Sequence, residues 1–396
     1  MALTVIDALL PDGTRTTLRM DNGVVASVGG APEPGDRILD AAGRLLLPAM
    51  AEAHAHLDKA FLAETVPNPT GDLMGACDAI ELHRGRITLA DTEERAERAA
   101  RLIAANGATA IRTHADVTVE NGMMSVEALL GVRDRLRDVV DIQVFALCGW
   151  PSRADEQQVL IREAIRLGVD GIGGCPHIED DPNGVTDMLL ELAGQADLPL
   201  DLHTDETTNA EKFALPYLAE RVLATGFSQH VAASHCVSLG MQTEQEQQRV
   251  AELVAAAGIS VIALPSSNLY LLGRDQQVAM PRGLTALKAL RSAGVNVAAG
   301  ADNLQDPFNL VGRGDCMETA ALMVMAGHLL PDDAYHSVSS ASRHALGLPE
   351  AAVRVGAAAD FVLLNARSTR EAVAFAPAAR IVVRAGNTAF TPGVNS

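Results

Sequence analysis

Four side chains that can bind a metal ion stand near the ends of short apolar runs. They come from the segments AEAHAH, LDLHTDE and AAGADN, and are His54, His56, His203 and Asp302. Imidazole nitrogens and carboxylate oxygens are ligands of Zn²⁺ and Fe²⁺ in catalytic proteins. His54 and His56 are two residues apart, a spacing that puts both side chains on one face of a strand. If the chain brings the four residues together, they predict a site for a divalent metal ion, zinc or iron.

Two more titratable residues end apolar runs and are free for proton transfer. Glu206 follows His203 by three residues, and His235 ends the run VAASH. A bound metal ion lowers the pKa of a water molecule to about 7, and a carboxyl or imidazole group beside it can carry protons. Taken singly, each motif also has a structural explanation, because an aspartate after a strand often caps a helix. Together they indicate a hydrolytic site.

The middle of the chain contains the elements that must position these residues. Apolar runs alternate there with amphipathic stretches such as 121–137, 154–168 and 184–196. We count eight candidate strands, and this alternation is typical of parallel βαβ units that close into a (β/α)8 barrel. A doubly wound sheet is the alternative, but no GxGxxG motif follows the early strands. In a barrel the carboxyl ends of all strands meet at one mouth, so the candidate residues would converge there.

The two ends of the chain have a different sequence pattern from the middle. Residues 1–47 contain short candidate strands and tight turns, and residues 347–396 repeat this pattern in RVGAAADFVLLNA and ARIVVRAG. Neither segment is long enough for a good core alone, and chain termini commonly lie close together. We therefore expect one composite β-sandwich from both ends, with the barrel over residues 48–346.

The amino-acid composition and net charge limit the classes of partner that the chain can bind. The chain has 396 residues, of which 48% are hydrophobic, and a net charge of -19. The apolar fraction excludes a disordered chain, and the charge disfavours a nucleic-acid binder. The five cysteines form no CxxC pair, which is typical of a reducing compartment. The sequence shows no basic signal segment and no apolar run of about 18–20 residues. We therefore expect a cytoplasmic protein with no membrane contact. We expect its partner to be a small molecule, and a homo-oligomer is compatible with the sequence.

On these motifs the chain resembles the amidohydrolase superfamily, and within it the cytosine deaminase-like branch. The resemblance covers nearly the whole chain and rests on LPAMAEAHAHLDKAF, DLHTDE, SHC, GADNLQDPF and GAAADFVLL. It implies that the two histidines of HAH, the histidine of DLHTDE and Asp302 hold the metal, and that Glu206 and His235 act on the substrate and the bound water. Binuclear relatives need a lysine on strand four. The stretch GVDGIGGCPH has none, so we expect one divalent metal ion.

The resemblance leaves the substrate ring open. Cytosine deaminases carry a glutamine near the end of strand three, and the register puts Gly149 at that position, with Trp150 next to it. A missing amide leaves a polar ring edge unpaired, which disfavours cytosine itself. A substituted pyrimidine, a triazine, a pterin or a creatinine-like ring is comparably favoured. Gly149 would leave room for a larger ring, and Trp150 would offer a stacking face.

Several other polar residues lie close to the predicted mouth. We expect His114 and Asp306 among the substrate contacts, although His114 and Asp116 could equally support the metal ligands from behind. Asp58 and Lys59 follow the HAH motif and form either a structural ion pair or a substrate contact. His177 follows a proline, and we interpret it as a loop residue.

The sequence thus predicts a metal-dependent hydrolytic deaminase of a small nitrogen heterocycle that releases ammonia. Asp302 and His235 would hold the proton of the attacking water, and Glu206 would protonate the adjacent ring nitrogen. The alternatives are removal of an alkylamine from a triazine-like ring, opening of a cyclic amide, and a non-catalytic, metal-stabilised binding protein. A binding protein needs no proton-transfer pair, so Glu206 and His235 disfavour the last alternative.

Overall fold

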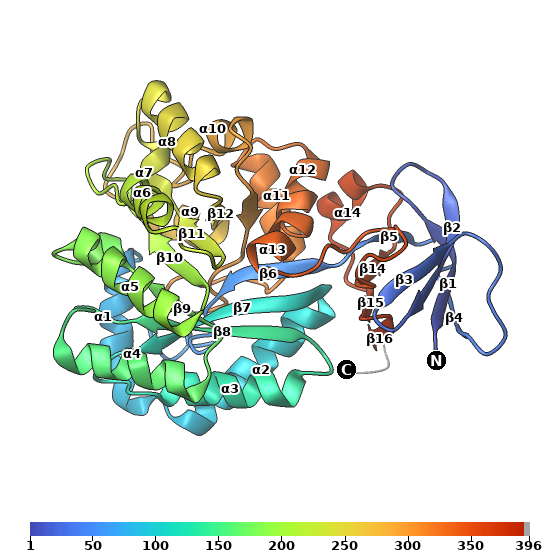
Figure 1. Ribbon diagram of the computed structural model, residues 1–396, viewed down its shortest axis with the longest axis horizontal. Helices are drawn as coiled ribbons and strands as arrows, with labels where there is room; N and C mark the ends of the chain where they lie inside the picture. The colour runs from blue at the N-terminus through green and yellow to red at the C-terminus, as the bar shows by residue number, and fades with distance from the viewer. Residues whose placement is uncertain (392–396) are drawn as a thin grey trace.

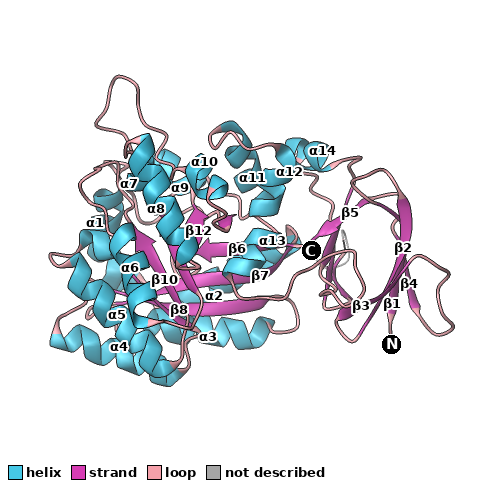
Figure 2. Ribbon diagram, turned by 45° about the horizontal axis from the view of Figure 1, so that its top comes forward, coloured by secondary structure: helices cyan, strands magenta, loops and turns pink. Residues whose placement is uncertain are grey.

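The computed structural model describes residues 1–391, which form two bodies. Figure 1 shows a parallel sheet surrounded by helices and, beside it, a smaller sheet in which blue N-terminal and red C-terminal strands lie side by side. Figure 2 shows the strands of the larger body enclosed by helices. The chain therefore has a helix-covered core and a terminal sheet attached to one side of it.

The larger body is a parallel barrel. Its strands run in the order β13-β12-β11-β10-β9-β8-β7-β6. The strands are β6 (Met50–Ala55), β7 (Ala108–Val117), β8 (Asp141–Cys148), β9 (Gly171–Gly174), β10 (Leu200–Thr204), β11 (Val231–His235), β12 (Ser260–Ala263) and β13 (Val297–Ala299). A parallel bridge between Ala55 and Asp302 joins the first strand to the segment after the last one. The predicted (β/α)8 barrel is confirmed.

Helices connect the strands and bury one face each against them. They include α2 (Leu89–Ala105), α3 (Met124–Leu136), α4 (Asp155–Leu167), α5 (Pro182–Ala196), α6 (Leu215–Thr225) and α8 (Glu244–Ala256). In α3 the buried residues Val126, Leu129 and Val132 recur every three residues and face the barrel core. The side chains of Thr88 and Thr243 accept main-chain hydrogen bonds and cap the starts of α2 and α8.

Glycines in β9 make room inside the barrel for large side chains. A Cβ atom on Gly171 would lie 2.3 Å from the ring of Phe145, and one on Gly173 would lie 2.8 Å from Nδ1 of His114. Both neighbours are fully buried. The short GIGG strand thus lets an aromatic ring and an imidazole fill the interior behind the mouth.

Both ends of the chain build the second sheet, as predicted. Its main path is β16-β15-β14-β5-β1-β2-β3, with β4 paired to β1. β5 (Leu45–Pro48) pairs antiparallel with β14 (Phe361–Leu364) and joins the two ends of the sequence. The other strands are β1 (Leu3–Leu9), β2 (Arg15–Asp21), β3 (Val24–Val28), β4 (Arg37–Asp40), β15 (Ile381–Arg384) and β16 (Asn387–Phe390). Its core contains Leu18, Met20, Leu46 and Phe361.

Within residues 1–391, no helix is both long and apolar enough to cross a membrane. All five cysteines are free. Three of them, Cys148, Cys236 and Cys316, are buried, and they pack as small apolar residues.

Candidate active site

The seam that closes the barrel brings three of the predicted metal ligands together. His54 lies on β6, His56 follows that strand, and Asp302 follows β13. The Asp302 amide donates to the His54 carbonyl oxygen (3.0 Å), and the His56 amide donates to the Asp302 carbonyl oxygen (3.3 Å). Asp302 has a φ of 68°, and His235 at the end of β11 has a φ of 69°. Such left-handed backbone is uncommon for residues with a Cβ atom and concentrates at functional sites.

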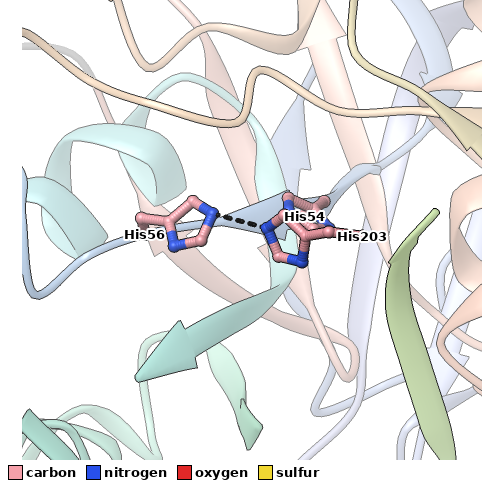
Figure 3. A group of neighbouring side chains, drawn as sticks. All are labelled: His54, His56 and His203. Carbon is pink, nitrogen blue, oxygen red and sulfur yellow. Dashed lines mark hydrogen bonds between the residues drawn. The ribbon is translucent and has the colours of Figure 1, made fainter. Parts of the chain in front are cut away.

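The four side chains form a compact group, which we call the metal-ligand cluster (His54, His56, His203 and Asp302). Figure 3 shows the three imidazole rings gathered together. Nε2 of His203 lies 3.2 Å from Nε2 of His54 and 3.1 Å from Nε2 of His56. Oδ1 of Asp302 lies 3.7 Å and 3.3 Å from the same two atoms. Metal–ligand bonds of about 2.0–2.2 Å in a tetrahedral site give ligand separations of roughly 3.4 Å, so the spacing suits such a metal ion.

The protonation of the cluster also suits a cation. Burial, together with the neighbouring imidazoles, holds the pKa of His54 and of His203 well below the usual range, so both rings are neutral. Oδ1 of Asp302 is buried and has no hydrogen-bond partner among the described residues. A buried carboxylate oxygen is rarely left unpaired. Neutral imidazoles and an unpaired carboxylate oxygen are the donor set that a divalent ion requires.

Glu206 and His235 lie beside the cluster, with Asn268 between them. Nδ1 of His235 is 3.4 Å from Oε1 of Glu206. The amide nitrogen of Asn268 lies 3.0 Å from Nδ1 of His235 and donates to Oε1 of Glu206 at 3.2 Å. Burial, with the charge of Asp302, raises the pKa of Glu206 well above its usual range, and burial lowers the pKa of His235 to about 4. A protonated carboxyl and a neutral imidazole are thus available for proton transfer.

Sequence reasoning missed two residues of this group. Asn268 and Ser267 belong to α9 (Pro265–Leu271), directly after β12. The hydroxyl of Ser267 donates to Oδ2 of Asp302, which leaves Oδ1 facing the imidazoles. The polar SSN triplet at the end of the seventh strand was the signal that could have identified both.

A cavity of about 440 Å³ opens from the cluster. One side of α1 (Leu73–His83) forms part of its wall through Leu73, Cys77 and Ile80. These residues recur at helical spacing, so a single face of α1 covers the mouth. The metal-ligand cluster and the apolar wall together make a concave site with a few convergent polar groups, which is the usual form of a small-molecule site.

Gly149 and Trp150 both line this cavity, but the expected role of Gly149 is not supported. A Cβ atom there would lie 2.7 Å from Cγ2 of Thr118 and 3.0 Å from the carbonyl oxygen of Val117. The missing side chain therefore allows the ends of β7 and β8 to pack closely, and it does not enlarge the cavity. Trp150 stands at the rim with 60% of its surface exposed.

The two other expected substrate contacts, His114 and Asp306, do not line the cavity. His114 is fully buried, and its ring centroid lies 4.2 Å from that of His54. Asp306 accepts hydrogen bonds from the amides of Phe308 and Asn309, so it shapes the loop after β13. Each residue is held inside the protein by its own neighbours, so a substrate contact of His114 or Asp306 stays a prediction without support from the cavity lining.

Lys59 takes part in a buried ion-pair group that also borders the cavity. Its Nζ atom lies 2.6 Å from Asp116 and 3.4 Å from Asp58. Burial opposes the charge of Lys59, but the two carboxylates outweigh it and raise the pKa. Asp58 and Lys59 therefore form the structural ion pair that was one of the two expectations, and Lys59 and Asp116 also face the cavity.

His177 differs from its interpretation as a plain loop residue, because it is buried and lines the cavity. Its Nδ1 donates to the carbonyl oxygen of His203 at 3.0 Å. Burial lowers the pKa of His177 to about 4, so the ring is neutral. The preceding Pro176 starts a short 3-10 turn that carries the imidazole inward, which spacing along the sequence does not reveal.

A barrel whose strand ends carry a metal-ligand cluster beside a proton-transfer pair defines the class of metal-dependent barrel hydrolases. Residues 88–390 match the model of the amidohydrolase family. The chain belongs to the amidohydrolase family and is a hydrolase of carbon–nitrogen bonds other than peptide bonds. The resemblance inferred from the sequence motifs is thereby confirmed.

Individual relatives place the chain near heterocycle deaminases. Pterin deaminase of Rhizobium rhizogenes is 35% identical over 352 residues, which cover 86% of this chain and 80% of that protein. N-isopropylammelide isopropyl amidohydrolase of a Pseudomonas species is 25% identical and covers 85% and 83%, respectively. The structure of 5-methylcytosine deaminase from Klebsiella pneumoniae, liganded with phosphonocytosine, superposes with a TM-score of 0.90 at 28% identity and covers 99% of both chains.

Proposed function

We propose that this protein is a metal-dependent deaminase that hydrolyses the exocyclic carbon–nitrogen bond of a small heterocycle and releases ammonia. The convergence of the metal-ligand cluster with the buried pair Glu206 and His235 supports this function most directly. The family assignment and the deaminase relatives agree with it. We propose that the cluster holds one divalent ion, zinc or iron, because its imidazole and carboxylate donors suit both metals.

When bound, the metal ion supplies Lewis-acid activation of a water molecule. The chain's own residues then handle the protons. In its protonated form, Glu206 donates a proton to the ring nitrogen next to the amine-bearing carbon, which lets that carbon become tetrahedral. His235 is neutral and has an Nε2 atom without a partner among the described residues, so it accepts or holds the proton of the water with Asp302. Glu206 next takes up the hydroxyl proton of the tetrahedral carbon and transfers it to the departing amine, which leaves as ammonia. The proton held by His235 and Asp302 then returns to Glu206 and restores its protonated form.

A two-ring amidine such as a pterin is the favoured substrate class. The cavity of about 440 Å³ lies within the range of about 300–1,000 Å³ that is common for sites binding drug-sized molecules. The 35% sequence identity with a pterin deaminase also favours a pterin-like ring. Trp150 at the rim offers a ring face for stacking, and the main chain of Gly149 borders the same space.

Removal of an alkylamine from a triazine-like ring is the second candidate. Its support is the 25% identity with the isopropylammelide hydrolase and the apolar wall from Leu73 and Ile80, against which an alkyl group could pack.

A product assay separates the two candidates. Purified protein, reconstituted with zinc or iron, would be given pterins, 5-methylcytosine, cytosine, aminotriazines, creatinine and N-isopropylammelide, with ammonia and isopropylamine measured separately. We expect ammonia release with the highest kcat/KM on a pterin. Isopropylamine release as the main activity would replace the first candidate by the second, and no turnover on any amine-bearing ring would overturn the deaminase function.

A further inference from the structure

A column of buried polar side chains runs from the metal-ligand cluster through the barrel interior. It consists of His54, Ser234 on β11, Asp201 on β10 and Arg112 on β7, each of them almost fully buried. Buried polar groups are usually all hydrogen-bonded, and here every contact has a distance suitable for a hydrogen bond. The direction of each bond can therefore be worked out from the chemistry of its atoms.

The end of the column that is farthest from the metal-ligand cluster is an ion pair between Arg112 and Asp201. Arg112 donates to Oδ2 of Asp201 at 2.9 Å and to the carbonyl oxygen of Ala345 at 3.0 Å. The Arg112 guanidinium keeps its charge in proteins, and a buried charge requires an oppositely charged partner within reach, which here is the Asp201 carboxylate. Asp201 is therefore an ionised carboxylate, and a carboxylate can only accept hydrogen bonds.

The carboxylate of Asp201 determines the direction in which the hydroxyl group of Ser234 donates its hydrogen. Its hydroxyl lies 2.7 Å from Oδ1 of Asp201, so the single hydrogen of Ser234 is donated there. The same oxygen lies 2.9 Å from Nδ1 of His54. With no second hydrogen to give, Ser234 can only accept from His54, so Nδ1 of His54 carries a hydrogen. In the neutral ring, Nε2 then carries no hydrogen and has a free lone pair. Nε2 is also the atom that faces His203 and Asp302.

We propose that Ser234 and Asp201 are positioning residues for metal binding, and that they act by selecting the tautomer of His54 that presents Nε2 to the metal ion. This inference rests on the metal site of the proposed function. Partners of this kind orient a ligand ring and increase its basicity, and their loss typically weakens metal binding about 10–100-fold. Arg112 contributes by pairing with the Asp201 carboxylate and holding it in place.

The test compares two serine-to-alanine substitutions at fully buried positions. Ser234→Ala removes the acceptor of His54, whereas Ser342→Ala is the matched control, since the Ser342 hydroxyl donates only to the carbonyl oxygens of Ala299 and Ser337. Zinc affinity would be measured by competition with a chelator, and thermal unfolding of the metal-free proteins would be measured alongside. We expect a roughly 10–100-fold weaker zinc affinity for Ser234→Ala and an unchanged affinity for Ser342→Ala.

A second measurement does not depend on the variants. Nitrogen-15 NMR of histidine side chains in the metal-free wild-type protein reports which ring nitrogen carries the hydrogen, and we expect the Nδ1–H tautomer for His54. A predominant Nε2–H tautomer, or equal zinc affinity in Ser234→Ala and wild type, would overturn the positioning role and leave the proposed function intact. A wild-type protein that binds no divalent metal would overturn both.

Discussion

At the residue scale, two buried carboxyl groups of the site are held in opposite states by their surroundings. Burial and the charge of Asp302 raise the pKa of Glu206. Burial opposes ionisation of Asp302 as well, but His56, His235 and the Ser267 hydroxyl outweigh it and lower the pKa. Neighbouring carboxyl groups with diverging pKa values are typical of an acid paired with an ionised partner. The two opposite pKa shifts agree with the proposed roles of Glu206 as proton donor and of Asp302 as metal ligand.

The role of Glu206 predicts the result of an isosteric change. Glu206→Gln keeps the shape of the side chain and its contact with Asn268, but removes the transferable proton. We expect normal folding and metal content with kcat reduced by about 10²–10⁴, the range for general acid–base groups. Steady-state ammonia release and elemental analysis on one sample check this. Near-normal kcat with full metal content would exclude Glu206 from proton transfer.

The metal-ligand cluster predicts a joint loss of metal and activity. His54→Ala removes one of the converging nitrogen atoms, and we expect lower metal content together with lower turnover. His336→Ala, a change at an exposed histidine, is the control and should alter neither. Elemental analysis after chelator treatment and reconstitution should give one ion per wild-type chain. A requirement for two ions would contradict the single-metal site.

At the element scale, the short strand β9 depends on glycine because Phe145 occupies the space in front of it. Gly171→Ala would bring a Cβ atom to 2.3 Å from that ring, and overpacking of this kind destabilises by about 1–3 kcal/mol. Gly194→Ala in α5 is the matched control, since its Cβ atom would meet Phe227 only at 3.8 Å. Replacing a helix-interior glycine by alanine stabilises by about 0.5–1 kcal/mol. Urea unfolding of both variants tests the opposite signs, and equal effects would refute the packing argument.

At the scale of the whole molecule, buried polar contacts attach the terminal sheet to the barrel. Arg380, before β15, donates to both carboxylate oxygens of Asp315 at 2.7 Å and 2.6 Å, and Asp315 caps α11 (Cys316–Met325). The Tyr335 hydroxyl donates to the carbonyl oxygen of Pro48 at 2.6 Å. These contacts secure both ends of the chain to the helices behind the metal site, so loosening them should reduce the stability of the entire chain.

Two arginine substitutions test this attachment. Arg380 is 2% exposed, and breaking a buried pair by removing one partner costs about 3–5 kcal/mol. Arg367, whose side chain is 85% exposed beside Glu371, belongs to a surface pair worth about 0–1 kcal/mol. We therefore expect a much larger loss in the free energy of unfolding for Arg380→Ala than for Arg367→Ala. Similar losses in urea titrations would show that the Arg380 contact does not hold the terminal sheet in place.

The sequence by itself determined the barrel, the composite terminal sheet and the identity of the candidate ligands. Those features follow from local pattern, because apolar runs alternate with amphipathic helices and polar residues stand at the ends of strands. Only the tertiary structure decided that Gly149 serves packing against Thr118, and that His177 and Asn268 face the site. These facts depend on distances between segments far apart in the chain and on turns that redirect a side chain. The same holds for the direction of the bond between His54 and Ser234, which exists only because strands 180 residues apart meet inside one barrel.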